Sequence, residues 1–204
     1  VSMGINRSDI MELAYNVSNL AAAGLQPSSA WNNVISTTLG KWWLDPQSAA
    51  QGPSGRYWQY DVAEAKKLLD AAGGAGAPIK LNYAGVRYGP TFALVAEGIG
   101  NWLLELGLDV EVEVQDYAST YFPQTRAGNF HGVAIGSAPA YPEVSGFLNR
   151  FYSSASSNAS KVSDPAIDEL RAKQAIEFDP EARLEQIHEI QRINGENMYY
   201  TPTS

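Results

Sequence analysis

The chain has 204 residues, of which 45% are hydrophobic and 18% are charged, a composition typical of a folded protein large enough to bury a core. Its formal net charge of −8 includes only 14 lysines and arginines, which argues against a nucleic-acid partner because phosphate binding needs clustered cations. Cysteine is absent, which excludes disulfides and cysteine-based zinc sites, and no apolar run approaches the ~20 residues of a membrane-spanning helix.

The first part of the chain contains one clear helix signal followed by a long irregular stretch. Asn6 has the side chain and position of an N-cap for a short helix, with Asp9 three residues later. The opening residues read as the interior of a helical region, without a signal peptide, so we expect the chain to be a piece of a longer protein. No hydrophobic period holds over residues 17–55, and long irregular segments in compact domains are usually functional or mobile.

Aromatic residues crowd this irregular stretch, namely Trp31, Trp42, Trp43, Trp58 and Tyr60. Core aromatics usually fall within periodic segments, whereas aromatics on irregular loops often line an interface or a ligand cleft. The alternative is a small satellite core beneath the loop. The sequence leaves both interpretations open.

Residues 60–114 predict a helix, a strand, a second helix and a second strand in order. Asp61 followed by Glu64 has the pattern of a capping box, and the glycines from position 73 form the turn that ends this helix. The strand at 79–83 alternates apolar residues with Lys80 and Asn82, which predicts a half-buried strand. Residues 108–114 alternate valines with acidic residues, which predicts a strand with one dry and one charged face.

The last part of the chain continues the alternation. We predict a kinked helix over 117–127, a short strand over 131–136 and a loop over 136–146. Ser163 is placed as the cap of the next helix, and Asp179, followed by proline, begins the last long helix. Alternating strands and helices predict an α/β layered domain.

Catalytic and cofactor patterns are weak. Only His131 and His188 could serve as the base of a hydrolase, and Ser137 lacks the G-x-S-x-G setting of a nucleophile elbow. The glycines at 73–76 follow a helix and precede a strand, the reverse of a dinucleotide-binding turn. Glu111 and Glu113 resemble a glycosidase pair, but their alternation with valines favours a solvent face. We therefore predict no catalytic residue, cofactor or metal site.

Several motifs, in order, resemble the extracellular solute-binding proteins, family 5. The most specific is Y-D-x-x-x-A-K-x-L-L-x-x-A-G at 60–73, and L-x-x-x-G-L-x-V follows at 103–110. The helix start at 2–11 also fits, as do these later residues: Tyr141, Pro142, Glu143, Phe147, Leu148, Asp179, Arg183 and Gln191. The resemblance spans nearly the whole chain and is weakest over 17–55.

This resemblance implies an α/β, type II periplasmic-binding-protein-like lobe with a mixed β-sheet flanked by helices. Residues 1–204 would form a single domain, the second (C-terminal) lobe, and about 195–204 would begin the return to the missing first lobe. The expected function is capture of an oligopeptide or oligosaccharide for an ABC importer, without catalysis. Permease membrane subunits would be partners of a monomer outside the cytoplasm, in the periplasm or on the outer face of the membrane, with lipid anchoring undecided.

The resemblance also suggests which residues meet the ligand: Arg87, Tyr88, Ala140, Tyr141, Trp42, Trp43 and Trp58. Ala140 stands where many peptide-binding members carry the aspartate that pairs with the ligand's amino terminus, and Ser137 stands near the usual tryptophan. A buried ammonium without a partner is costly, which favours a neutral ligand or an anchor elsewhere. The alternatives are a carbohydrate-active enzyme with aromatic subsites and paired carboxylates, or a self-contained interaction module.

Overall fold

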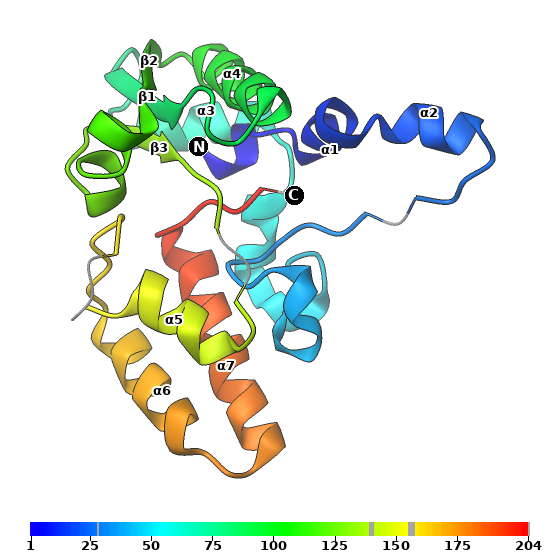
Figure 1. The fold of residues 1–204 in the computed structure, drawn as a ribbon, viewed down its shortest axis with the longest axis vertical. Helices are drawn as coiled ribbons and strands as arrows, with labels where there is room; N and C mark the ends of the chain where they lie inside the picture. The colour runs from blue at the N-terminus through cyan, green and yellow to red at the C-terminus, as the bar shows by residue number, and fades with distance from the viewer. Residues whose placement is uncertain (28, 139–140, 155–157, 204) are drawn as a thin grey trace. The chain divides into compact units, whose positions relative to one another are not determined.

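The computed structural model describes residues 1–27, 29–138, 141–154 and 158–203. The chain forms two compact units, which we describe separately. Unit 1 is built from residues 1–29 and 59–137, and unit 2 from residues 30–58 and 138–203. Figure 1 labels the helices and strands of both units.

Unit 1 is a three-stranded sheet with helices. Its strands are β1 (Pro78–Ala84), β2 (Asp109–Gln115) and β3 (Val133–Ile135), and its helical segments are η1 (Ser2–Gly4), α1 (Arg7–Tyr15), α2 (Val17–Ala22), α3 (Val62–Ala71), α4 (Pro90–Glu105), η4 (Tyr117–Tyr121) and η5 (Thr125–Ala127). The sheet order is β2-β1-β3, and β1 runs parallel to both neighbours, with Leu81 opposite Val112 and Val133. The described strands thus form a parallel sheet, where we expected a mixed one. The α/β class is as expected.

Helix α4 covers one face of this sheet. Gly100 lies so close to the strands that a Cβ there would be 3.1 Å from Leu81 and 3.8 Å from Val112, which explains a glycine inside a long helix. Leu81 and Leu103 are fully buried at this contact. The dry face predicted for β2 is only partly correct, because Val112 and Val114 remain 48% and 58% exposed on a strand at the sheet edge.

Asn82 lies at the centre of the sheet and is only 2% exposed, so its predicted solvent position is wrong. Its amide nitrogen donates to the carbonyl oxygens of His131 and Val133, each at 3.0 Å. Its amide oxygen accepts from Nε2 of Gln115 at 3.2 Å. A buried amide is satisfied in this way at little cost, and it joins both neighbouring strands to β1.

The predicted helix caps are largely confirmed. The side chains of Asn6 and Asp61 accept from the third backbone N–H of α1 and α3, at 3.2 and 2.9 Å. The capping box at α3 is only half formed, because the backbone N–H of Asp61 donates to the carbonyl of Met3. Gly73, with φ of 70°, closes α3 as expected.

Unit 2 is helical. Its elements are η2 (Thr37–Trp42), η3 (Ala49–Trp58), α5 (Val144–Tyr152), α6 (Pro165–Ile176) and α7 (Pro180–Asn197). Its core is formed mainly by buried residues of α5, α6 and α7, including Leu148, Ile167 and Ile187. Two predictions are corrected here: α5 begins inside the stretch expected to be a loop, and Asp164 caps α6 in place of Ser163.

Residues 30–58, where we expected no regular structure, form short helical turns. Helix α7 fixes these turns through hydrogen bonds and close packing. Gln191, fully buried, accepts from the Leu44 N–H at 3.0 Å and donates to the Trp42 carbonyl at 2.8 Å. Gly195 packs beside Gln51, where a side chain would collide. Across the described residues of both units, we find no helix with the length and apolarity needed to cross a bilayer.

Candidate functional site

The carboxyl ends of β1, β2 and β3 meet at one edge of the unit 1 sheet, because the strands are parallel. Open α/β sheets place their ligands outside this edge, on the loops that follow the strands. Here those loops are residues 85–89 after β1, the segment that begins at Asp116 after β2, and the residues that begin at Gly136 after β3. We call this region the carboxyl edge.

A set of rings, which we call the tyrosine cluster, gathers at the carboxyl edge: Tyr88, Phe92, Tyr117, Tyr121 and Phe122. The Tyr88 ring lies 4.8 Å from Phe92 and 6.0 Å, edge-on, from Tyr117. Tyr117 stacks on Tyr121 at 5.9 Å and lies 5.8 Å from Phe122. Residues far apart in sequence thus form one aromatic surface. Phe122 is its exposed member, with 56% of its surface open to solvent.

Two arginines border the tyrosine cluster. The Arg87 guanidinium carbon lies 5.0 Å from the centre of the Tyr117 ring. Arg126 donates from Nη1 to the carbonyl oxygen of Ser137 at 3.3 Å. Within the described ranges, neither guanidinium forms an ion pair with a carboxylate, whereas Arg171, Arg183 and Arg192 do. Both remain able to bind a carboxylate or several hydroxyl groups.

Buried hydrogen bonds fix the segment that carries Tyr117 and Tyr121. Thr125 donates from its hydroxyl to Oε1 of Gln115 at 2.6 Å, and Gln115 is in turn bonded to Asn82. Tyr121 donates to the carbonyl oxygen of Ile135 at 2.9 Å. Burial, followed by the nearby Tyr88, raises the pKa of Tyr121 to about 12, so its hydroxyl stays protonated and can donate at neutral pH.

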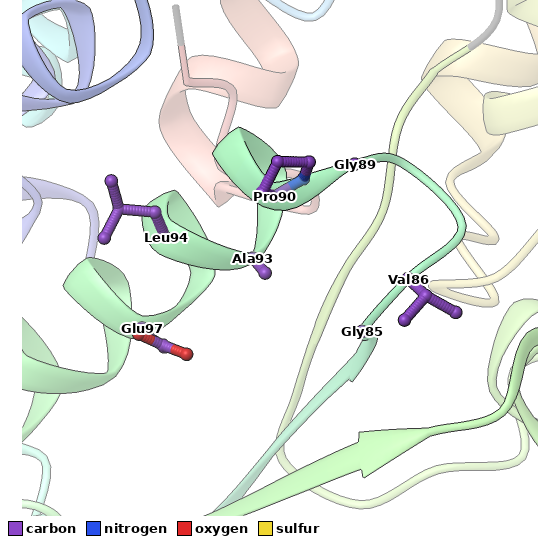
Figure 2. A pocket seen from close by; sticks show the side chains of 7 residues that line it. All are labelled: Gly85, Val86, Gly89, Pro90, Ala93, Leu94 and Glu97. Carbon is purple, nitrogen blue, oxygen red and sulfur yellow. The ribbon is translucent and has the colours of Figure 1, made fainter.

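An open hollow of about 450 Å³ lies between loop 85–89 and α4 (Figure 2). The loop contributes Gly85, Val86 and Gly89, and the first turns of α4 contribute apolar side chains together with the carboxylate of Glu97. Gly85 has no room for a side chain, because a Cβ would lie 2.6 Å from Val114. The volume is within the range of ligand sites, ~300–1,000 Å³.

The structure groups only some of the predicted site residues. Arg87 and Tyr88 meet at the carboxyl edge, whereas Trp42, Trp43 and Tyr141 belong to unit 2 and are half-buried against its core. Trp58 is fully buried and donates from its indole to the Asn32 carbonyl at 3.2 Å, so it presents no surface to a ligand in this structure. Ala140 lies outside the described residues.

The tryptophans of unit 2 are held by their neighbours. Two cations lie over the Trp42 ring, the Lys41 ammonium at 4.6 Å and the Arg183 guanidinium at 4.8 Å from its centre. Trp43 donates from its indole to the Trp31 carbonyl at 3.2 Å. Between the two interpretations left open by the sequence, this packing favours the satellite core for these two rings.

Sequence reasoning did not identify Arg126, Tyr117 or Glu97 as site candidates. The first two were assigned to a kinked helix without a role. Tyr117 could have been found, because it closely follows the strand predicted over 108–114. Arg126 carried no such signal, since its position depends on a turn of the chain that only the structure shows.

The residues of the weak enzymatic patterns noted in the sequence do not come together in one site. Glu111 and Glu113 both pair with Lys80, at 3.4 and 3.2 Å, and so lie side by side on one strand. His188 contacts the carbonyl of Lys41 in unit 2, where burial lowers its pKa. Among the residues for which coordinates are described, no group of three or more histidine, aspartate or glutamate side chains is placed to hold a metal ion.

Comparison with known proteins gives a consistent result. The family model described as bacterial extracellular solute-binding proteins, family 5 Middle, matches residues 1–159. The periplasmic murein peptide-binding protein MppA of Escherichia coli strain K12 is 31% identical over 143 residues, covering 69% of this chain and 26% of MppA.

Solved structures share the fold at lower identity. The periplasmic binding protein DppA of Helicobacter pylori, in complex with the peptide STSA, has a TM-score of 0.69 and 21% identity, over 98% of this chain and 36% of DppA. A mannohexaose-bound periplasmic oligopeptide-binding protein of Thermotoga maritima has a TM-score of 0.74 and 17% identity, over 98% of this chain and 39% of its own. The chain therefore spans well under half the length of these relatives. The match over residues 1–159 identifies the chain as a member of the bacterial extracellular solute-binding proteins, family 5.

Proposed function

We propose that this chain is part of the substrate-binding component of an ABC-type importer and that its carboxyl edge contacts the ligand. The observation that carries the proposal is the pair Arg87 and Arg126 beside the tyrosine cluster, with no carboxylate partner among the described residues. Guanidinium groups without a carboxylate partner, next to tyrosine rings, suit a ligand that offers both polar and apolar groups.

The ligand that we propose is an oligopeptide or an oligosaccharide. MppA is named for murein peptides and DppA was solved with a peptide, while the Thermotoga relative was solved with mannohexaose. A peptide carboxylate would suit either arginine, and sugar hydroxyls and ring faces would suit Arg87 and Tyr117. The two ligand classes therefore share one contact surface and differ in the charge that they bring to it.

We propose a conformational mechanism without catalysis. Residues 1–204 would serve as the second lobe of a two-lobed clamp, and the segment from about 195 would lead toward the first lobe. Ligand that touches both lobes stabilises the closed state, because only that state makes both sets of contacts. Ala140, Trp42, Trp43 and Tyr141 stay proposed contacts of this lobe, because Trp42 and Trp43 pack on the core but are only partly buried, whereas the buried Trp58 is better regarded as a core residue.

The names of the relatives also bear on where the protein acts. The relatives are named as periplasmic, so we propose that the protein acts outside the cytoplasm, as a monomer that presents its closed form to the permease subunits. Neither a cofactor nor a nucleic acid is part of this proposal.

Calorimetry on the complete protein that carries this chain tests the proposal. A tripeptide library and a series of mannose oligosaccharides would be titrated separately. The mass of the recovered ligand would then be measured by mass spectrometry. We expect one class to bind and to be recovered unchanged. Chemical turnover, or no binding by either class, would refute the receptor function.

A matched pair of variants tests the location of the ligand. Arg87→Gln removes a charge at the carboxyl edge, and we expect binding to weaken roughly tenfold to a hundredfold, as for the loss of a charged hydrogen bond. Lys66→Gln removes an equal charge from the exposed surface of α3 and should leave the affinity unchanged. Equal effects of both variants would show that the ligand lies elsewhere.

A further inference from the structure

The hollow beside loop 85–89 differs in chemistry from the tyrosine cluster. Its walls are apolar, formed by Val86 on the loop and by Pro90, Ala93 and Leu94 on α4. Val86 and Leu94 are 86% and 46% exposed, which is a large apolar area for a surface that stays in water. The hollow ends at one charged side chain, that of Glu97.

The Glu97 carboxylate is turned toward this hollow. Figure 2 shows Ala93 and Glu97 extending from α4 toward the side where Gly85 and Val86 lie. In the part of the chain that the structure describes, the side chain of Glu97 makes no hydrogen bond or ion pair. Burial raises the pKa of Tyr83, at the end of β1, and the negative charge of Glu97 raises it further, which agrees with a carboxylate that faces the strand.

A flexible cation fits this arrangement. Pro90 and Glu97 are seven residues apart on α4, which separates them by about 10 Å along the axis, and one turn from Ala93 to Glu97 is about 6 Å. An extended lysine side chain is about as long as the turn from Ala93 to Glu97, and it has an apolar stem and a charged tip. Its stem would lie between Ala93 and Val86 while its ammonium group reached the carboxylate.

A positive charge lies on the same loop, on Arg87, which follows Val86. Its guanidinium lies over the Tyr117 ring and does not line the hollow. The loop therefore contributes to two environments, because Arg87 contacts the tyrosine cluster and Val86 lines the hollow beside α4. A ligand that carries both a carboxylate and an amine could contact both.

We propose that the hollow formed by loop 85–89 and α4 is a side-chain subsite of the carboxyl edge that accepts a lysine-like cationic side chain of the ligand, with Glu97 as its charge partner. This inference rests on the proposed function, because it assigns a specificity to the same ligand. It predicts a preference for peptides with a basic residue over peptides with an apolar residue of equal length.

Methyl NMR on the chain tests the subsite directly. The methyl groups of Val86 and Leu94 would be followed during titration with N-acetyl-lysine-N-methylamide and with the norleucine analogue, which has the same stem without the ammonium group. We expect the lysine compound to shift these methyl signals with an affinity up to about fivefold higher, the upper end of the range for a solvent-accessible ion pair.

Three variants accompany the titration. Glu97→Gln should abolish the preference, Ala93→Met should weaken both compounds by filling the hollow, and Glu196→Gln, an equal charge change on the exposed surface of α7, should change nothing. Absent methyl shifts, equal affinities for the two compounds, or a preference that survives Glu97→Gln would overturn the proposal.

A second arm separates this proposal from the receptor function. Calorimetry on the complete protein would compare tripeptides with lysine or norleucine at one position in turn. Tight binding without any lysine preference would support the receptor and overturn the subsite. A lysine preference in the NMR arm, together with no binding of any tripeptide or oligosaccharide, would support the subsite and refute the receptor.

Discussion

Replacing Asn82 with leucine tests whether the buried amide network holds the carboxyl edge together. The substitution keeps the size of the side chain but removes three hydrogen bonds, to His131, Val133 and Gln115. At about 1 kcal/mol each, these bonds contribute about 3 kcal/mol. Burial of the leucine side chain would return about 1.5 kcal/mol, so we expect a net loss of about 1.5 kcal/mol.

Urea unfolding measures this loss, and amide hydrogen exchange locates it. We expect faster exchange in β3, which Asn82 anchors, than in α7 of unit 2. Asn101→Leu on the exposed surface of α4 is the control and should change the free energy of unfolding by less than about 0.5 kcal/mol. A stabilised Asn82→Leu protein, or unchanged exchange in β3, would show that the network is not structural.

Two further changes test unit 2 and the β1–β3 pairing. Burial lowers the folded-state pKa of His188, although its contact with the Lys41 carbonyl opposes this. Near pH 6 the unfolded chain therefore binds more protons than the folded protein. We expect the free energy of unfolding to fall from pH 7.5 to pH 5.5. His188→Gln should flatten this part of the pH dependence in denaturant titrations, and an equally steep profile would contradict the assignment. Gly132→Ala would place a Cβ 2.7 Å from the backbone nitrogen of Lys80 at φ of +84°, so we expect a loss of about 2 kcal/mol or more in thermal unfolding. Gly76→Ala has a similar φ of +70° with open space around it, and an equal loss there would mean that backbone strain alone explains the effect.

The elements of unit 1 were predictable where their signals are local. Asn6, Asp61 and Gly73 mark helix ends through hydrogen bonds to neighbouring residues, and these assignments are confirmed. Asn82 was misplaced because alternation assumes that one face of a strand meets water. In a parallel sheet, a central strand is covered on both faces, and a polar residue there must be satisfied within the protein.

The candidate site was predictable only in part, because it depends on contacts between distant segments. Arg87 and Tyr88 follow a recognisable strand and could be proposed from sequence. Arg126 reaches the same region on a turn whose Thr125 is bonded to Gln115 at the end of β2. Glu97 gains its proposed role from loop 85–89 folding beside α4, which no periodicity indicates.

The central claim is that ligand is held, unaltered, against the carboxyl edge of unit 1. The most direct measurement is a crystal structure of the complete protein with the tightest ligand from the calorimetric series. We expect an intact ligand in contact with Arg87 and with the ring of Tyr88 or Tyr117. Ligand bound elsewhere, with this edge still facing solvent, would contradict the account, as would a cleaved or modified ligand.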